Sequence, residues 1–145
     1  MFKKILVPSD GSKLAHGAAE FAAALAKVHG ASVVGLYVID PFPYIGIGDA
    51  SAAGLQAYMG EAQAAADRSL GDIQACCEAR GVAFAADTIE RNSTYEGILE
   101  TAQDEACDLI VMGSHGRTGV KALILGSVAQ KVLTYAKVPV LIVKP

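Results

Sequence analysis

A run of glycines ahead of Ser127 is the part of this sequence best suited to chemistry. Gly113, Gly116, Gly119 and Gly126 stand between an apolar run and the start of a predicted helix. Glycines allow the main chain to approach an anion closely and to turn its N–H groups toward it. A helix that begins at Ser127 adds free N–H groups, a helix dipole and a hydroxyl donor. The segment therefore predicts a site for phosphate or another anion, with turn chemistry in the absence of a ligand as the alternative.

A second polar segment, Pro8-Ser9-Asp10-Gly11, follows the apolar run near the N-terminus. The carboxylate of Asp10 could accept a hydrogen bond from a ribose hydroxyl. Neither segment carries a common phosphate motif. No Gly-x-x-x-x-Gly-Lys-Ser/Thr run is present, and Gly46-Ile47-Gly48 lacks the third glycine of the dinucleotide fingerprint.

The histidines give little support for catalysis. A hydrolase needs a nucleophile or a water that is positioned by an oriented base. Ser114 and His115 are neighbours, and neighbouring side chains rarely point at each other. We therefore interpret His115 as loop structure or a phosphate contact rather than a general base. His16 and His29 are expected on the surface of the first helix, and the spacing of the histidines argues against a built-in zinc site.

Strand and helix patterns alternate along the chain and must position these segments. Apolar runs predict strands at Lys4–Val7, Ser32–Ile39, Val82–Ile89, Leu109–Met112 and Val138–Val143. Helices are predicted between Ser12 and Gly30, from Ser51 to Arg80, from Ser93 onward, and from Ser127 to Ala136, with loops at Asp40–Ala50 and Gly113–Leu125. Such alternation predicts an α/β fold: a three-layer, open, parallel five-stranded sheet of order 3-2-1-4-5 with helices on both faces. Ligands of such sheets bind beyond the carboxyl ends of the strands at the switch point, here between strands one and four. Both polar segments lie there.

Local signals refine this prediction. Ser12 is a candidate N-cap, Gly30 and Gly81 are candidate helix ends, and Ser93-Thr94-Tyr95-Glu96 is a capping-box pattern. Apolar residues at spacings of three and four predict a buried stripe along the second helix, made of Leu55, Met59, Ala62, Ala66, Leu70, Ile73 and Cys77.

Composition narrows the classes of protein. The 145 residues are 52% hydrophobic and 19% charged, which favours one globular domain spanning residues 1–145. The net charge of −3 and the absence of a basic patch argue against nucleic-acid binding. No uncharged apolar run approaches the length of a membrane span. Cys76, Cys77 and Cys107 suggest no disulfide framework, so we expect reduced, structural thiols in a cytoplasmic protein.

The whole chain resembles the universal stress protein family. The spacing Gly-x2-Gly-x9-Gly-Ser, at Gly113, Gly116, Gly126 and Ser127, is similar to that family's ATP loop. The opening Ile5-Leu6-Val7-Pro8-Ser9-Asp10-Gly11-Ser12, the stretch Leu36-Tyr37-Val38-Ile39-Asp40, the run from Asp108 to Arg117 and the closing Val138-Pro139-Val140-Leu141-Ile142-Val143 match as well.

This resemblance implies a function and a set of site residues. It implies bound ATP rather than FMN, with Mg²⁺ arriving on the phosphates. It places Pro8, Ser9, Asp10 and Val38 around the adenosine, with Met112, Gly113, His115, Gly116, Gly126, Ser127 and Val128 along the phosphate loop. On this basis, valine at Gly116 or Gly126 is expected to abolish nucleotide binding and to leave the fold nearly intact.

The resemblance also implies a homodimer that pairs through the strand Val138–Val143, a regulatory module that responds to nucleotide. A slow ATPase or autophosphorylating enzyme that uses the same site is the alternative. A phosphoacceptor receiver or a flavodoxin fits poorly, because the first strand ends in Ser9-Asp10 without an acidic pair and the third ends in Ile89-Glu90-Arg91.

Overall fold

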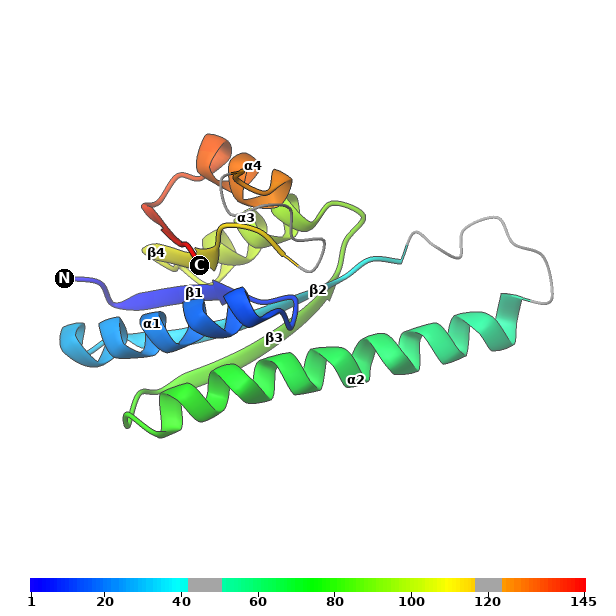
Figure 1. Ribbon diagram of the computed structural model, residues 1–145, viewed down its shortest axis with the longest axis horizontal. Helices are drawn as coiled ribbons and strands as arrows, with labels where there is room; N and C mark the ends of the chain where they lie inside the picture. Colours follow the sequence, from blue (N-terminus) through cyan, green and yellow to red (C-terminus); the bar gives the residue numbers. More distant parts are fainter. Residues whose placement is uncertain (42–50, 117–123) are drawn as a thin grey trace.

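A parallel five-stranded sheet in the order β3-β2-β1-β4-β5 forms the centre of the molecule, as predicted (Figure 1). The computed structural model describes residues 1–41, 51–116 and 124–145. The strands are β1 (Lys4–Pro8), β2 (Ser32–Ile39), β3 (Phe84–Glu90), β4 (Leu109–Gly113) and β5 (Val140–Val143). The helices of the described residues are α1 (Lys13–His29), α2 (Ser51–Glu78), α3 (Thr94–Asp104) and α4 (Ser127–Tyr135). The predicted alternation of strands and helices is confirmed, with element ends shifted by a few residues.

Helices cover both faces of the sheet. Ile5 and Val7 pack with α1 and α2, whereas Leu6 packs with α3 and α4, because successive side chains of a strand point to opposite faces. All three side chains are fully buried. The central strand β1 is therefore apolar on both faces, as expected of a parallel sheet between two helical layers.

The strands β1 and β2 do not end together. Their pairing stops at Pro8, which lies opposite Leu36, while β2 continues to Ile39 beside β3. On the other side, β1 pairs with β4 through Ile5 and Leu6. The chain therefore continues to one side of β1 through β2 and β3 and to the other side through β4 and β5. Space opens beyond the carboxyl end of β1, between β2 and β4.

The helix ends follow the local sequence in part. The Ser12 hydroxyl accepts a hydrogen bond from the Ala15 N–H at 3.2 Å, and Gly30 ends α1 in the left-handed region at φ 67°. The capping box predicted at Ser93 marks the start of α3 correctly, but its side-chain hydrogen bonds are not formed. Ser93 is the N-cap residue of α3, but its side chain makes no capping hydrogen bond. Glu96 instead accepts a hydrogen bond from the Tyr95 hydroxyl at 3.2 Å.

The helix α2 is longer than the sheet it covers. Its 28 residues span about 42 Å, whereas the 8 residues of β2 span about 26 Å. The N-terminal part therefore projects past the sheet (Figure 1). The predicted stripe is buried from Ala66 to Cys77, but Leu55 is 42% exposed because no sheet lies beneath it.

No helix in the described part of the chain is long and apolar enough to cross a membrane. Residues 42–50, within the predicted loop Asp40–Ala50, and residues 117–123, within the predicted glycine loop, lie outside the described residues. The predictions for Gly46, Gly48 and Gly119 therefore remain predictions.

Candidate functional site

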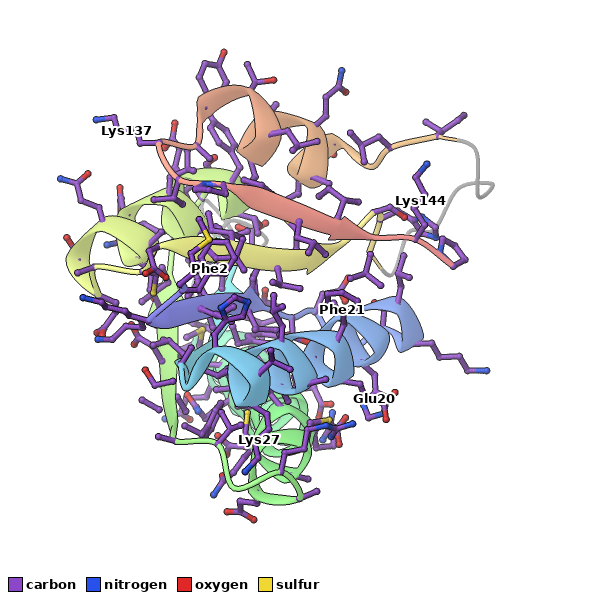
Figure 2. The ribbon with its side chains drawn as sticks, turned by 90° about the vertical axis from the view of Figure 1, so that its left-hand side faces the viewer. Phe2, Glu20, Phe21, Lys27, Lys137 and Lys144 are labelled. Carbon is purple, nitrogen blue, oxygen red and sulfur yellow. The ribbon has the colours of Figure 1, made fainter. Side chains whose placement is uncertain are left out.

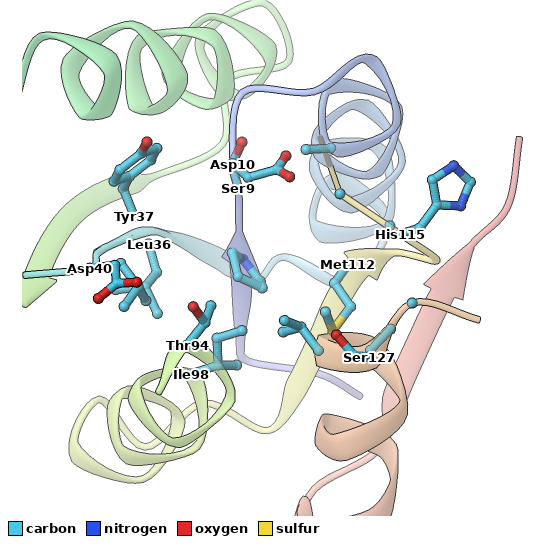
Figure 3. A pocket seen from close by; sticks show the side chains of 18 of the residues that line it. Ser9, Asp10, Leu36, Tyr37, Asp40, Thr94, Ile98, Met112, His115 and Ser127 are labelled. Carbon is cyan, nitrogen blue, oxygen red and sulfur yellow. The ribbon is translucent and has the colours of Figure 1, made fainter. Parts of the chain in front are cut away.

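A cavity of about 640 Å³ lies beyond the carboxyl ends of β1, β2 and β4 (Figure 3). The first turns of α3 and α4 border it, and the projecting part of α2 contributes Tyr58 and Ala62. Every site residue named from the sequence lines this cavity: Pro8, Ser9, Asp10, Val38, Met112, Gly113, His115, Gly116, Gly126, Ser127 and Val128. The fold thus brings the two polar segments together at one cavity.

The turn after β1 fixes the position of Asp10. The Ser9 N–H donates to the Leu36 carbonyl at 2.9 Å, and the Gly11 N–H donates to the Ser9 hydroxyl at 3.1 Å. The Oδ1 atom of Asp10 accepts a hydrogen bond from the Ser12 N–H at 3.0 Å. Gly11 has φ 82°, a conformation that other residues rarely adopt. This turn directs the Asp10 carboxylate toward β4, where Oδ2 reaches Gly116.

The glycines of the loop are held against neighbouring residues. A β-carbon at Gly116 would overlap the Oδ2 atom of Asp10, and one at Gly113 would lie 3.0 Å from the Leu14 Cγ atom. At Gly126, a β-carbon would lie 2.9 Å from the Cα atom of His115. Side chains at these positions would displace the loop or its neighbours, so backbone atoms form this part of the wall.

The start of α4 is joined to the end of β4. The Gly126 N–H donates to the Ser114 carbonyl at 2.6 Å, and the Ser114 N–H donates to the Val143 carbonyl of β5 at 3.0 Å. As Gly126 is the N-cap of α4, it offers no side chain to the first-turn N–H groups. Those groups are available to an anion in the cavity.

The expectation that Ser114 and His115 point apart is wrong. The Ser114 hydroxyl lies 3.2 Å from the His115 Nδ1 atom. Ser114 is buried and does not line the cavity, and Figure 3 shows the His115 imidazole directed away from the other labelled side chains. The contact stabilises the loop, and neither group is aimed at the middle of the cavity.

The main chain of Val38 faces the cavity. In a strand, the N–H and C=O groups of alternate residues point to the same neighbouring strand. The Leu36 carbonyl accepts from Ser9 on the β1 side, and the Ile39 carbonyl accepts from Arg91 on the β3 side. Val38 therefore directs both groups to the β1 side, beyond the last residue of β1 that pairs with β2. A donor and an acceptor stand side by side there.

Several lining residues were not predicted from the sequence. They are Tyr37, Asp40, Tyr58, Ala62, Thr94, Ile98, Ile124, Leu125 and Gln130, with Ala15, Leu36, Ile39 and Ala129 completing the wall. Thr94 follows β3 and could have been found, because the carboxyl ends of neighbouring parallel strands meet at one edge. Tyr58 could not, because its place depends on how far α2 projects. Its hydroxyl donates to the Asp40 carbonyl.

The charges along the described wall are mainly acidic. The carboxylates of Asp10 and Asp40 and the imidazole of His115 line the cavity, and no lysine or arginine of the described segments does so. Among the described residues, no group of three histidine, cysteine, aspartate or glutamate side chains could hold a metal ion.

Residues 1–144 match the model of the universal stress protein family. The chain belongs to this family. It is 36% identical over 145 residues to the universal stress protein MJ0531 of Methanocaldococcus jannaschii, covering 99% of this chain and 83% of that protein. The solved structure of MJ0577 from the same organism matches with a TM-score of 0.84 at 30% identity, covering 100% of this chain and 97% of that chain.

Two further structures of universal stress proteins contain adenine nucleotides. One is a complex with cAMP, at a TM-score of 0.73 and covering 98% of this chain and 97% of that chain. The other, from Archaeoglobus fulgidus, is a complex with dAMP, at a TM-score of 0.69 and covering 98% of each chain. Each of these two proteins is 22% identical in sequence to this chain, and at that identity the structural match establishes a common fold and nothing more.

Proposed function

We propose that this universal stress protein is an ATP-binding regulatory module that acts as a homodimer. The observation that carries the proposal is the wall of the cavity at the β1–β4 switch point. The backbones of Gly113, Gly116 and Gly126 and the uncapped start of α4 form one end, and the Val38 main chain forms the other. One end suits phosphates and the other suits a flat base that carries a donor beside an acceptor.

The Val38 main chain favours adenine among the purines. Adenine presents an amino donor next to a ring-nitrogen acceptor, which complements the carbonyl and N–H groups of one residue. Hypoxanthine presents the reverse pattern, so the Val38 carbonyl would face another acceptor and the Val38 N–H would face another donor. Asp10, fixed by its bond from Ser12, lies between the two ends and is suited to accept from a ribose hydroxyl. The cAMP and dAMP complexes of two relatives agree with an adenine ligand.

The phosphates would be held mainly by backbone groups. The N–H groups at Ser127 and Val128 begin α4, where the helix dipole favours negative charge. Because the described wall carries aspartates and no lysine or arginine, we expect much of the phosphate charge to be balanced by Mg²⁺ that enters with the nucleotide. Such an ion keeps water and phosphate oxygens as ligands.

The open edge of β5 supports the homodimer. In the described part of the chain, β5 pairs with β4 on one side and is the last strand of the sheet, with half-buried Leu141 and Val143 packed toward α1. Phe21, 47% exposed, lies on the side of α1 nearer β5 (Figure 2). An apolar edge strand beside exposed apolar side chains favours pairing with another chain. The homodimer is tested by sedimentation equilibrium, where a monomer at all concentrations would refute this part of the proposal.

The first experiment identifies the ligand. Freshly purified protein is denatured and the released small molecules are analysed, and stripped protein is then titrated calorimetrically with ATP, with and without Mg²⁺, and with inosine triphosphate. We expect ATP to bind, more tightly with Mg²⁺ and more tightly than inosine triphosphate. No released adenine nucleotide and no binding heat at several temperatures would overturn the proposal.

Variants of His115 and Asp10, assayed for ATP binding and for phosphate release, distinguish a regulatory module from a slow ATPase. The His115 imidazole is bonded to a buried hydroxyl rather than aimed at the cavity, which favours binding over turnover. We expect His115→Ala to bind ATP and to leave any phosphate release unchanged. If His115→Ala or Asp10→Ala abolished turnover while retaining ATP affinity, the site would be catalytic.

A further inference from the structure

Thr94 places a hydroxyl at the base end of the cavity. It is the first residue of α3, and Figure 3 shows its side chain directed into the cavity beside Ile98 and toward the end of β2. Within the described residues, the Thr94 hydroxyl makes no hydrogen bond to the protein. By contrast, Tyr58 at the same end donates to the Asp40 carbonyl. Thr94 is itself exposed, so its hydroxyl is open to solvent and to a ligand in the cavity, which Leu36, Val38 and Ile98 also line.

We propose that Thr94 is a further nucleotide-binding residue that contacts the purine ring, an inference that rests on the proposed ATP site. The Val38 main chain takes the edge of adenine that carries the amino group and N1. Two ring nitrogens, N7 and N3, then remain on the flanking edges, and both are acceptors. The Thr94 hydroxyl reaches the cavity from α3, outside the plane of the sheet, and donates to one of them.

The strength of this contact follows from its chemistry. Thr94→Val replaces the hydroxyl by a methyl group of similar size, so the volume of the side chain is kept and the donor is lost. The ring nitrogen is then left facing an apolar group instead of a hydrogen-bond donor. A net neutral hydrogen bond corresponds to roughly 3- to 10-fold in affinity.

The test is a cycle of protein variants and ligands measured by calorimetry on stripped, full-length protein. The ligands are ATP, 7-deaza-ATP and 3-deaza-ATP, which lack one ring nitrogen each. The variants are Thr94→Val, Thr94→Ser, which keeps the hydroxyl, and the control Thr88→Val, on β3 and outside the cavity.

We expect Thr94→Val to bind ATP roughly 3- to 10-fold more weakly, with Thr94→Ser and Thr88→Val close to the parent protein. We also expect the loss to disappear with one of the two deaza analogues, which identifies the nitrogen. An unchanged ATP affinity in Thr94→Val, or the same loss with both analogues, would overturn the role of Thr94. ATP binding by the parent protein separates these outcomes from failure of the proposed function, since a parent protein that binds no ATP refutes both.

Discussion

Gly116 lies against the carboxylate of Asp10, so close that a β-carbon at position 116 would overlap the Oδ2 atom. These residues are far apart in the sequence and follow the two strands that flank the switch point. The contact brings the β1 turn and the β4 loop together in the wall of the cavity, and among the lining glycines Gly116 is the one where an added β-carbon would meet its neighbour most closely.

Valine at Gly116 is therefore expected to weaken ATP binding by at least about tenfold. The obstacle is the end of the Asp10 side chain rather than a buried backbone, so the fold should tolerate the change. The matched control is Gly71→Val, on the exposed face of α2 where a β-carbon meets nothing within 4 Å. Calorimetric titration measures the affinity and thermal unfolding checks the fold. An ATP affinity equal to that of the control would contradict the assignment of the loop.

Gly126 should behave differently. A β-carbon there would lie 2.9 Å from the His115 Cα atom and 3.0 Å from the Ser114 carbonyl oxygen, which are backbone atoms that cannot move away alone. Its φ of −62° is ordinary, so the cost arises from contact and not from backbone strain. We expect Gly126→Ala to lower the free energy of unfolding by about 1–3 kcal/mol.

This result would correct the expectation that Gly126 can be replaced without effect on the fold. Urea denaturation measures the change, with Gly60→Ala as the control because it lies in open space on α2. The control should be neutral or slightly stabilising, since alanine is the better helix former. Equal stability of both variants would show that the 114–115 backbone adapts at no cost.

The fold could be predicted from the sequence because its signals are local. Apolar strands alternate with capped helices, and the order of the sheet follows from that alternation. The segments around Asp10 and Gly116 met as predicted, because the carboxyl ends of parallel strands share one edge. Signals that span only a few residues, such as the N-cap at Ser12, also predicted the start of a helix correctly.

Features that depend on tertiary geometry were not predictable in this way. Whether Leu55 is buried depends on the length of the sheet beneath α2, which helical periodicity does not report. The Ser114–His115 contact depends on the backbone turn after β4, and Tyr58 reaches the cavity only because α2 projects beyond the sheet. In each case the sequence shows the type of the residue but not which residues lie next to it in the fold.

The two ends of α2 should differ in their contribution to stability. The Ile73 side chain is 1% exposed and packs in the core that α2 forms with α1 and the sheet. Ile73→Ala is therefore expected to lower the free energy of unfolding by about 2–5 kcal/mol. Leu55 belongs to the same stripe but is 42% exposed, and Leu55→Ala is expected to change stability by no more than about 0.5 kcal/mol. Urea denaturation of both variants tests this. A cost at Leu55 comparable with that at Ile73 would mean that the projecting part of α2 is covered in solution.

Asp108 should make stability depend on acid pH. Its Oδ2 atom accepts from the Lys3 N–H at 2.8 Å and its Oδ1 atom from the Lys4 N–H at 3.1 Å. Burial raises the pKa of this carboxyl, but the hydrogen bonds from Lys3 and Lys4 outweigh burial, so the pKa is lowered overall. The stabilisation is therefore fully present above the unfolded pKa of about 3.9 and is lost as the pH falls through the lower folded pKa.

Asp108→Asn is accordingly expected to be less stable than the parent protein at pH 7, because an amide can accept only one of the two N–H bonds well. The difference should shrink as the pH falls below about 4, because Asp108 takes up a proton there in the unfolded parent chain and only at lower pH in the folded one, where it then also loses an acceptor. Urea denaturation between pH 7 and pH 3 measures this, with Asp72→Asn on the exposed face of α2 as the control. A stability difference that stayed constant down to pH 3 would mean that the Asp108 carboxylate does not hold the start of β1 through its charge.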